Sequence, residues 1–245
     1  MKLIKLVREG KCMGTSKTIR LLMPQWQGGN NPAYHFGAQL LAWLAPQANC
    51  PEITIPVKSP DNNALSNENG IMGRGQVIEQ LHAARDIISE HSPDKMVILG
   101  GDCLVDLAPF AYLSEKYQDN FGILWLDAHP DVMTPEQFSH SHAHVLGALM
   151  GNGDKQLTSV VTTPVKANKI MIAGLNDPTD YEKDFISTNN ISTCSPEEIK
   201  SNSDKIVNWI KSEKITHLAV HFDLDVLNYH NFRSLLFAMP DIDEN

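Results

Sequence analysis

The sequence predicts an α/β protein in which a mostly parallel β-sheet carries helices on both faces. Short apolar segments with strand character alternate along the chain with longer segments of helical periodicity, and this order is typical of parallel sheets with crossover helices. Three predicted strands run directly into polar motifs, which are GGDC, LDAHPD and FDLD. Ligand sites of parallel sheets lie beyond the carboxyl ends of the strands, so we expect the functional site there. No linker or internal repeat divides the chain, which predicts one domain.

The amino-acid composition limits the classes of protein to which this chain can belong. The chain has 245 residues, of which 42% are hydrophobic and 20% charged, which is enough for a sizeable core. Its 20 basic and 29 acidic residues give a net charge of −9, which disfavours general binding to nucleic acid or anionic membranes. The four cysteines are scattered, and the sequence shows neither a membrane span nor a signal peptide pattern. We therefore expect a cytoplasmic protein with reduced thiols.

The first strand is expected over 17–26, where Pro24 and a glycine-rich turn stop an apolar run. The helix predicted next, over 32–46, has a proline at each end and one apolar face, formed by Phe36, Leu40, Leu41 and Leu44. There follow a short strand over 52–57, a polar loop over 60–70, a helix over 75–91, a buried strand over 95–103 and a helix over 104–117. The helix over 75–91 has apolar residues at helical spacing, namely Val77, Leu81, Ala84 and Ile88.

The second half of the chain repeats the pattern. Apolar strands are expected over 123–126, 169–177 and 216–227. A helix is predicted over 195–213, with Ser195 and Glu198 forming a capping box and Pro196 in the first position.

The acidic motifs after two of these strands predict a metal centre. Asp127, His129 and Asp131 follow one another at every second residue, and Asp223 and Asp225 have the same spacing. In extended backbone such residues face one side. Buried carboxylates without partners repel one another, and neither motif contains Lys or Arg. Divalent cations would compensate them, and ligands rich in oxygen favour an ion such as manganese. Two-metal hydrolytic sites usually hold their ions about 3.5–4 Å apart.

Each motif alone has a more ordinary interpretation. Acids after a strand often cap the next helix, Gly100-Gly101-Asp102 is typical of a tight turn, and SHSHAH is typical of a solvated loop. The joint occurrence of these motifs at successive strand ends favours the metal centre.

The motifs GGDC, WLDAHPD, SHSHAHVLGALMG and FDLDVL, in this order over roughly 18–237, resemble those of the arginase/agmatinase (ureohydrolase) family. The resemblance implies a three-layer α/β/α sandwich, related to that of deacetylases. It also implies two Mn²⁺ ions, which activate a hydroxide that attacks the carbon of a guanidinium or amidine, most often releasing urea. The implied partners are a small cationic guanidino or amidine substrate and, as in many members, further copies of the chain in a homo-oligomer.

The resemblance also implies a ligand set. Asp127 and Asp223 match the carboxylates that bridge both ions, Asp131 matches a ligand of one ion, and His129 and Asp225 match ligands of the other. Cys103 stands where the family commonly has a histidine ligand. A thiolate is softer and shifts preference toward zinc or iron; the alternative is a small buried residue at a helix start.

The predicted catalytic residues are Asp131 and His144. His144 matches the histidine thought to shuttle protons or contact substrate, and His142 is the alternative for that role. Members that hydrolyse arginine usually carry asparagine where this chain has Met133, so free arginine is not favoured. The family also often has Asp-Pro where Asn228 and Tyr229 stand, which affects the local loop rather than the ligands.

The sequence also leads to predictions about both ends of the chain. Because Met13 would be a natural start, residues 1–16 are expected to be an N-terminal extension, and 17–245 a single domain that lacks the family's C-terminal segment. That segment carries a substrate-contacting glutamate, and Glu244 lies too early to match it. We therefore expect a hydrolase of linear amidines with reduced activity. The alternatives are a non-catalytic relative that keeps metal binding and, less favoured, a deacetylase-like metal hydrolase.

Overall fold

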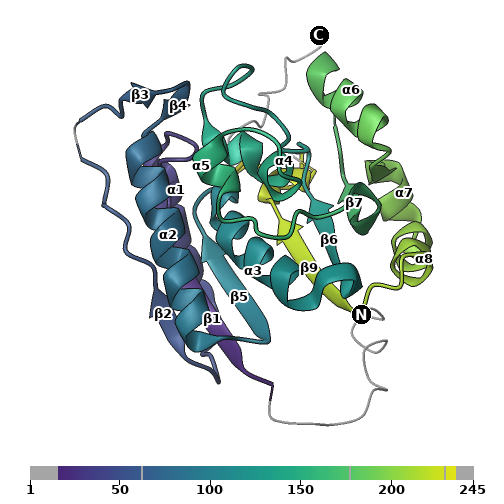
Figure 1. The fold of residues 1–245 in the computed structure, drawn as a ribbon, viewed down its shortest axis with the longest axis horizontal. Helices are drawn as coiled ribbons and strands as arrows, with labels where there is room; N and C mark the ends of the chain where they lie inside the picture. The colour runs from purple at the N-terminus through teal and green to yellow at the C-terminus, as the bar shows by residue number, and fades with distance from the viewer. Residues whose placement is uncertain (1–15, 62, 177, 229, 236–245) are drawn as a thin grey trace.

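The computed structural model describes residues 16–61, 63–176, 178–228 and 230–235 (Figure 1). Its strands are β1 (Thr18–Met23), β2 (Glu52–Thr54), β3 (Asn67–Glu68), β4 (Ile71–Met72), β5 (Lys95–Gly100), β6 (Phe121–Leu126), β7 (Ile170–Ala173), β8 (Ser192–Cys194) and β9 (His217–Phe222). Its α-helices are α1 (Pro32–Leu44), α2 (Arg74–His91), α3 (Leu107–Tyr117), α4 (Val145–Leu149), α5 (Lys155–Thr158), α6 (Asp180–Asn189), α7 (Pro196–Ser201) and α8 (Asp204–Ser212). The expected N-terminal extension, apart from Ser16, and Tyr229 and Glu244 lie outside the described residues.

The parallel strands form two hydrogen-bonded sheets instead of the single sheet expected. One has the order β2-β1-β5 and the other β8-β7-β6-β9, and every pairing within them is parallel. An antiparallel ribbon of β3 and β4 begins within the segment expected to be a polar loop and ends just after it. The mostly parallel arrangement is confirmed. Within the described residues, β5 and β9 each pair with a strand on one side only.

Successive side chains along each strand point to opposite faces of the sheet. In β6, Ile123 and Trp125 belong to the main core with residues of α2, α3 and α4, whereas Leu124 belongs to a second core with Trp209 of α8. Because residues two apart in a strand share a face, helices cover both faces of this sheet, as Figure 1 shows with α3 and α4 on the near side. The three-layer α/β/α arrangement is confirmed.

Helix α2 packs as predicted, whereas α1 does not. The apolar positions predicted for α2, from Val77 to Ile88, are fully buried. In α1 the predicted apolar face, from Phe36 to Leu44, is between 40% and 65% exposed, and Ala38 is the buried residue. The small Ala38 side chain allows α1 to approach the first sheet, and no segment described here covers the opposite side.

The helix predicted over 195–213 is two helices. The capping box of Ser195 and Glu198 is present, but α7 ends before Asn202, which has extended backbone with φ of −169°. The Asn202 side chain accepts a hydrogen bond from the Asp204 amide at 2.9 Å. Asparagine competes in this way with helical hydrogen bonding, so the break follows from one side chain.

Strand β5 is shorter and more exposed than predicted. It ends at Gly100, and Val97 is 46% exposed, because β5 is the outer strand of its sheet. None of the helices in the described ranges is both long and apolar enough to traverse a lipid bilayer.

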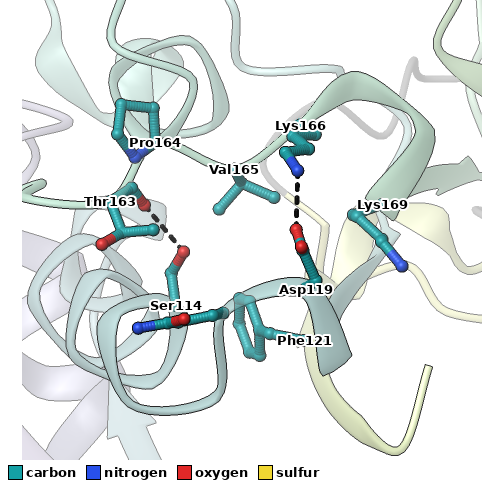
Figure 2. A pocket seen from close by; sticks show the side chains of 9 residues that line it. Ser114, Asp119, Phe121, Thr163, Pro164, Val165, Lys166 and Lys169 are labelled. Atoms are coloured by element: carbon teal, nitrogen blue, oxygen red, sulfur yellow. Dashed lines mark hydrogen bonds and ion pairs between the residues drawn. The ribbon is translucent and has the colours of Figure 1, made fainter.

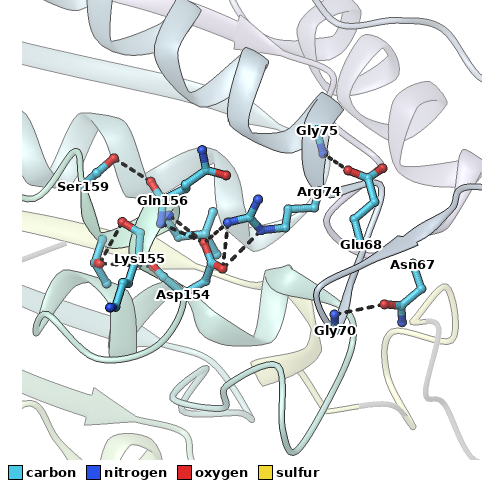
Figure 3. Close-up of polar contacts among 11 residues, drawn as sticks. Asn67, Glu68, Gly70, Arg74, Gly75, Asp154, Lys155, Gln156 and Ser159 are labelled. Carbon is cyan, nitrogen blue, oxygen red and sulfur yellow. Dashed lines mark hydrogen bonds and ion pairs between the residues drawn. The ribbon is translucent and has the colours of Figure 1, made fainter.

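A largely buried ion pair connects the start of α2 to α5. The Arg74 guanidinium donates three hydrogen bonds of 3.0–3.1 Å to the Asp154 carboxylate, which also accepts from the Gln156 amide at 2.9 Å and so caps α5 (Figure 3). Glu68 of β3 accepts from the Gly75 amide at 3.1 Å. The N-terminal turn of α2 is therefore hydrogen-bonded both to α5 and to the β3–β4 ribbon.

Candidate metal centre

The two acidic motifs follow neighbouring strands. Leu126 at the end of β6 pairs with Phe222 at the end of β9, and the Asp223 amide donates to the Leu126 carbonyl at 2.9 Å. Asp127 follows β6, and its amide donates to the Ala173 carbonyl of β7 at 3.1 Å. The motifs therefore lie at one end of one sheet, as predicted.

Neither motif continues as extended strand. Oδ1 of Asp127 accepts from the His129 amide at 2.6 Å, and Oδ1 of Asp223 accepts from the Asp225 amide at 2.8 Å. In each case the first carboxylate closes a turn around the residue two positions later, as Asp side chains commonly do. The expected extended geometry is wrong, and the spacing of two instead reflects this turn.

Further contacts join the two turns. The Ala128 amide donates to Oδ1 of Asp225 at 3.1 Å, and Nδ1 of His129 lies 2.9 Å from Oδ2 of Asp225 and 3.5 Å from Oδ1 of Asp127. Hydrogen bonds to Asp127 and Asp225 raise the pKa of His129 to about 11. Burial opposes ionisation of Asp127, but the hydrogen bond from His129 and the nearby His221 side chain outweigh it and lower the pKa of this carboxyl.

Two sets of donor atoms in this cluster could each hold a metal ion. One set consists of Cys103, Asp127, His221 and Asp223, and the other of Asp127, His129 and Asp225; within each set the donor atoms lie within 4.8 Å of one another. Asp127 belongs to both sets. A carboxylate shared between two ions is the usual arrangement of two-metal sites.

Asp131 lies beside these sets and is deeply buried. Its backbone has φ of +48°, and its carbonyl accepts from the amides of Leu146 and Gly147. Within the described residues, its Oδ2 has no hydrogen-bond partner. Burial and then the charge of Asp127 raise the pKa of Asp131 well above its ordinary value. A divalent cation would reverse this effect by favouring the ionised carboxylate, so the residues present fit a metal.

Cys103 joins the cluster from the other sheet. It begins the short 3₁₀ turn η2 (Cys103–Asp106) after β5, and its Sγ donates to Oδ2 of Asp223 at 3.4 Å. Burial, followed by the charge of Asp131, raises the pKa of this thiol well above its ordinary value. A neighbouring cation is therefore what would make Cys103 a thiolate ligand.

The GGD turn positions Cys103. A side chain at Gly101 would place its Cβ 1.9 Å from the Gln25 carbonyl oxygen, so only glycine fits this close approach. Asp102 accepts from the amides of Gly29 and Leu104, both at 3.1 Å, and burial raises its pKa to about 6. The loop after β1 and the start of η2 are thus held together next to the metal centre.

The two candidate histidines have different surroundings. His144 is buried, and its Nε2 donates to the Phe138 carbonyl at 2.8 Å. Burial lowers its pKa to about 4, and the charges that act on it are those of His140, His142 and Asp154. Burial also lowers the pKa of His142, but the charges acting there include those of Asp223, His129 and Asp127. The structure thus brings His142 into electrostatic contact with the acidic cluster, and the role of His144 stays a prediction.

Sequence reasoning missed two residues beside the cluster. His221 stands two positions before Asp223, and the spacing rule applied to the aspartates would have found it. Tyr34 of α1 had no such signal. Burial, followed by the charges of Cys103 and Asp102, raises the pKa of its hydroxyl, which places Tyr34 near the same cluster.

A separate cavity lies at the other end of β6. It has a volume of about 270 Å³ and is lined by Ser114, Gln118, Asp119, Phe121, Thr163, Pro164, Val165, Lys166 and Lys169 (Figure 2). Two of these residues, Lys166 and Asp119, form an ion pair at 2.6 Å. Phe121 is the first residue of β6, so this cavity is distinct from the metal centre.

Comparisons with known proteins identify a family and a fold for this chain. The sequence model of the Arginase family matches residues 45–232. An arginase of Staphylococcus aureus (strain MRSA252) is 26% identical over 172 residues, which cover 66% of this chain and 57% of that relative. The chain thus spans less than two thirds of that relative's length.

Two solved structures share the fold. The arginase of Entamoeba histolytica in complex with L-ornithine superposes with a TM-score of 0.76 at 22% identity, covering 90% of this chain and 79% of that one. An arginase from Bacillus caldovelox gives a TM-score of 0.76 at 20% identity, covering 88% of this chain and 78% of that one.

Proposed function

Because this chain belongs to the arginase family, we propose that it is a metal-dependent hydrolase that cleaves a C–N bond of a linear guanidino or amidine compound. The observation that carries the proposal is the pair of donor sets that share Asp127 at the ends of two adjacent strands. The proposed cofactor is a pair of divalent ions, with Mn²⁺ as the first candidate. Bound there, the ions would act as Lewis acids that polarise the substrate and activate water.

The protein's own residues would keep this centre in place. Trp125 donates from Nε1 to Oδ2 of Asp127 at 3.0 Å, while the His129 amide holds Oδ1. Both oxygens of Asp127 are therefore oriented before any ion binds. We assign Cys103 and Asp131 to one ion and His129 and Asp225 to the other, with Asp127 and Asp223 as the carboxylates expected to bridge both ions.

We assign proton transfer to His142 as the alternative to His144. Nδ1 of His142 donates to the Gly28 carbonyl at 3.2 Å, which leaves the lone pair on Nε2. Because burial lowers its pKa, the ring is neutral near pH 7 and Nε2 can accept a proton and then release it to the leaving amine.

The substrate is proposed to carry a cationic guanidinium or amidinium group and not to bind through an amino-acid head at Met133. An acidic cluster attracts a guanidinium or amidinium group. The half-buried Met133 offers no hydrogen bond to a carboxylate or ammonium group. Agmatine, guanidino acids and formiminoglutamate are therefore favoured over free arginine.

The test combines metal content with turnover. The protein, purified and reloaded with Mn²⁺, Co²⁺ or Zn²⁺, is analysed for bound metal and assayed with arginine, agmatine, guanidino acids and formiminoglutamate. We expect two ions per chain and release of urea, or of formamide from formiminoglutamate. Asp127→Asn should lower turnover by at least about 100-fold, more than the loss of an outer-shell partner costs.

Asp119→Asn is the matched control, since Asp119 is an exposed acid at the far end of β6. Its turnover should equal that of the wild type. Metal binding without turnover of any substrate would instead support a non-catalytic relative, and absence of metal binding would overturn the proposal.

A further inference from the structure

His221, the fifth residue of β9, has a fixed and buried ring. It is 5% exposed and stacks on Trp125, with ring centroids 3.7 Å apart and planes 10° apart. Phe110 holds Trp125 in turn through an edge contact at 6.5 Å. Nδ1 of His221 donates to Oδ2 of Asp106 at 2.7 Å. Stacking and this hydrogen bond together determine where the other ring nitrogen points.

That nitrogen, Nε2, points into the acidic cluster. It lies 3.4 Å from Oδ2 of Asp127 and makes no hydrogen bond to any residue that the structure describes. Charge-assisted hydrogen bonds are typically 2.7–2.9 Å long, and Oδ2 of Asp127 already accepts from Trp125. A buried nitrogen without a hydrogen bond is energetically unfavourable. We therefore expect Nε2 of His221 to have another partner.

We propose that Nε2 of His221 is a further ligand of the ion assigned to Cys103 and Asp131, which brings His221, Cys103, Asp127 and Asp223 together as four donors to one divalent ion. The four donor atoms lie within 4.8 Å of one another, so small adjustments of the side chains would bring them to about 2.0–2.3 Å from one ion. One thiolate, one imidazole and two carboxylates suit Zn²⁺, Co²⁺ or Fe²⁺ better than an all-oxygen set does. The inference deepens the proposed function and rests on it for the presence of an ion in the cluster.

The turn η2 supplies both Cys103 and the partner of His221. Residues three apart in a 3₁₀ turn lie on the same side, which places Cys103 and Asp106 together. Histidines that bind metals usually donate their second nitrogen to a carboxylate, which fixes the tautomer and the ring. Asp106 occupies that position, and it is itself buried.

The alternative is that His221 only bridges Asp106 and Asp127 as a charged side chain. In that case an ion would bind the remaining ligands, and replacing His221 would leave the coordination of that ion unchanged. Identifying the ligand atoms around the ion therefore distinguishes a His221 that binds the metal from one that only bridges Asp106 and Asp127.

The experiment is titration of the metal-free protein with Co²⁺, followed by absorption spectroscopy. With the wild type we expect a thiolate-to-cobalt charge-transfer band and visible d–d bands of Co²⁺ bound in the cluster. His221→Gln should change the d–d bands and weaken Co²⁺ binding by more than about 100-fold, because loss of an outer-shell partner alone costs about 10–100-fold. Asp106→Asn should fall within that smaller range.

The matched control is His217→Gln, on the same strand, where His217 stacks on Tyr117 at 3.6 Å far from the cluster. Its spectrum and affinity should equal those of the wild type. If His221→Gln does not fold, X-ray absorption of the wild type with one equivalent of Co²⁺ decides, since it detects sulfur and imidazole on the same ion.

Two results would overturn the proposal, and they differ. Wild-type Co²⁺ binding with a spectrum and affinity that His221→Gln preserves, or X-ray absorption that finds sulfur without imidazole, overturns the role of His221 and leaves the proposed function intact. Absence of Co²⁺ binding to the wild type overturns both.

Discussion

At the residue scale, Asp127 organises the candidate centre. One of its oxygens accepts from the amide of His129 and the other from the indole of Trp125. The carboxylate therefore keeps one rotamer without relying on an ion. Such preorganisation reduces the conformational entropy that binding would otherwise cost, and it explains how a buried acid at a strand end can be held in a folded chain.

Cys103 is predicted to bind one ion of the pair. Cys103→Ala should weaken one of two metal sites by at least about tenfold, because it removes the sulfur that lies 3.4 Å from Asp223. Cys103→His should keep or raise the affinity for Mn²⁺, since imidazole is less soft than thiolate. Isothermal titration with Mn²⁺ and Zn²⁺ measures both the stoichiometry and the affinity.

Cys194→Ala serves as the control for this pair of variants. Cys194 is as deeply buried, but it lies in the second core with Trp209, so its loss should leave metal binding unchanged. Equal stoichiometry and affinity in the wild type and Cys103→Ala would show that Cys103 only fills space.

The sequence located most of the site but not its geometry. The spacing of Asp127, His129, Asp223 and Asp225 singled out residues that the structure brings together. His221 obeys the same spacing but was not predicted, because only the carboxylates carry the charge repulsion that pointed to a metal. The choice between His142 and His144 depends on an irregular loop, where side-chain direction has no fixed period.

At the element scale, periodicity predicted helices well where it coincided with burial. In α2 the apolar residues at helical spacing are the buried ones. In α1 the same spacing lies on an exposed face. Periodicity identifies the apolar face of a helix, but it does not show whether another segment packs against that face. The single helix expected over 195–213 is interrupted at Asn202 by one side-chain hydrogen bond, which outweighs the apolar periodicity on either side.

The ion pair between Arg74 and Asp154 is predicted to be a strong local contribution to stability. Asp154→Ala removes the cap of α5, worth about 0.5–2 kcal/mol, and leaves a largely buried guanidinium without its partner. We expect a loss of roughly 2–4 kcal/mol in the free energy of unfolding, measured by urea denaturation. Asp154→Asn should cost less, because asparagine can still cap.

Lys166→Ala provides the comparison, because Lys166 and Asp119 form an exposed pair. Exposed pairs contribute little, about 0–1 kcal/mol. If Asp154→Ala were no more destabilising than Lys166→Ala, the link between α2 and α5 would be structurally unimportant.

At the scale of the whole molecule, the division into two parallel sheets could not be predicted from the sequence. Local patterns identify strands, but the pairing of β9 with β6, rather than with β7 or β8, depends on packing across the whole core. The comparisons confirm the family predicted from the motifs. The fold class was predictable because it depends only on the order of strands and helices.

The outer strands β5 and β9 are predicted to promote self-association. Val97 is 46% and Val220 49% exposed, and unpaired strand edges are templates for pairing with other chains. We expect the doubly substituted variant Val97→Lys/Val220→Lys to associate less than the wild type, because charged side chains on edge strands oppose such pairing. Sedimentation velocity over a range of concentrations measures the effect.

Trp43→Lys distinguishes the rival surface, since Trp43 is an exposed residue of α1. Association that persists in the double variant but disappears in Trp43→Lys would assign the contact to α1 and not to the strand edges.

The division into two sheets has a consequence for how the molecule opens. The first sheet is built from residues 18–100 and the second from 121–222, so each is a nearly continuous stretch of chain. Such stretches often unfold locally as cooperative units. Cys103 follows the first, whereas Asp127 and Asp223 follow strands of the second. An ion held by all three would act as a clamp between the units, and separating them would become less favourable as the concentration of free metal rises.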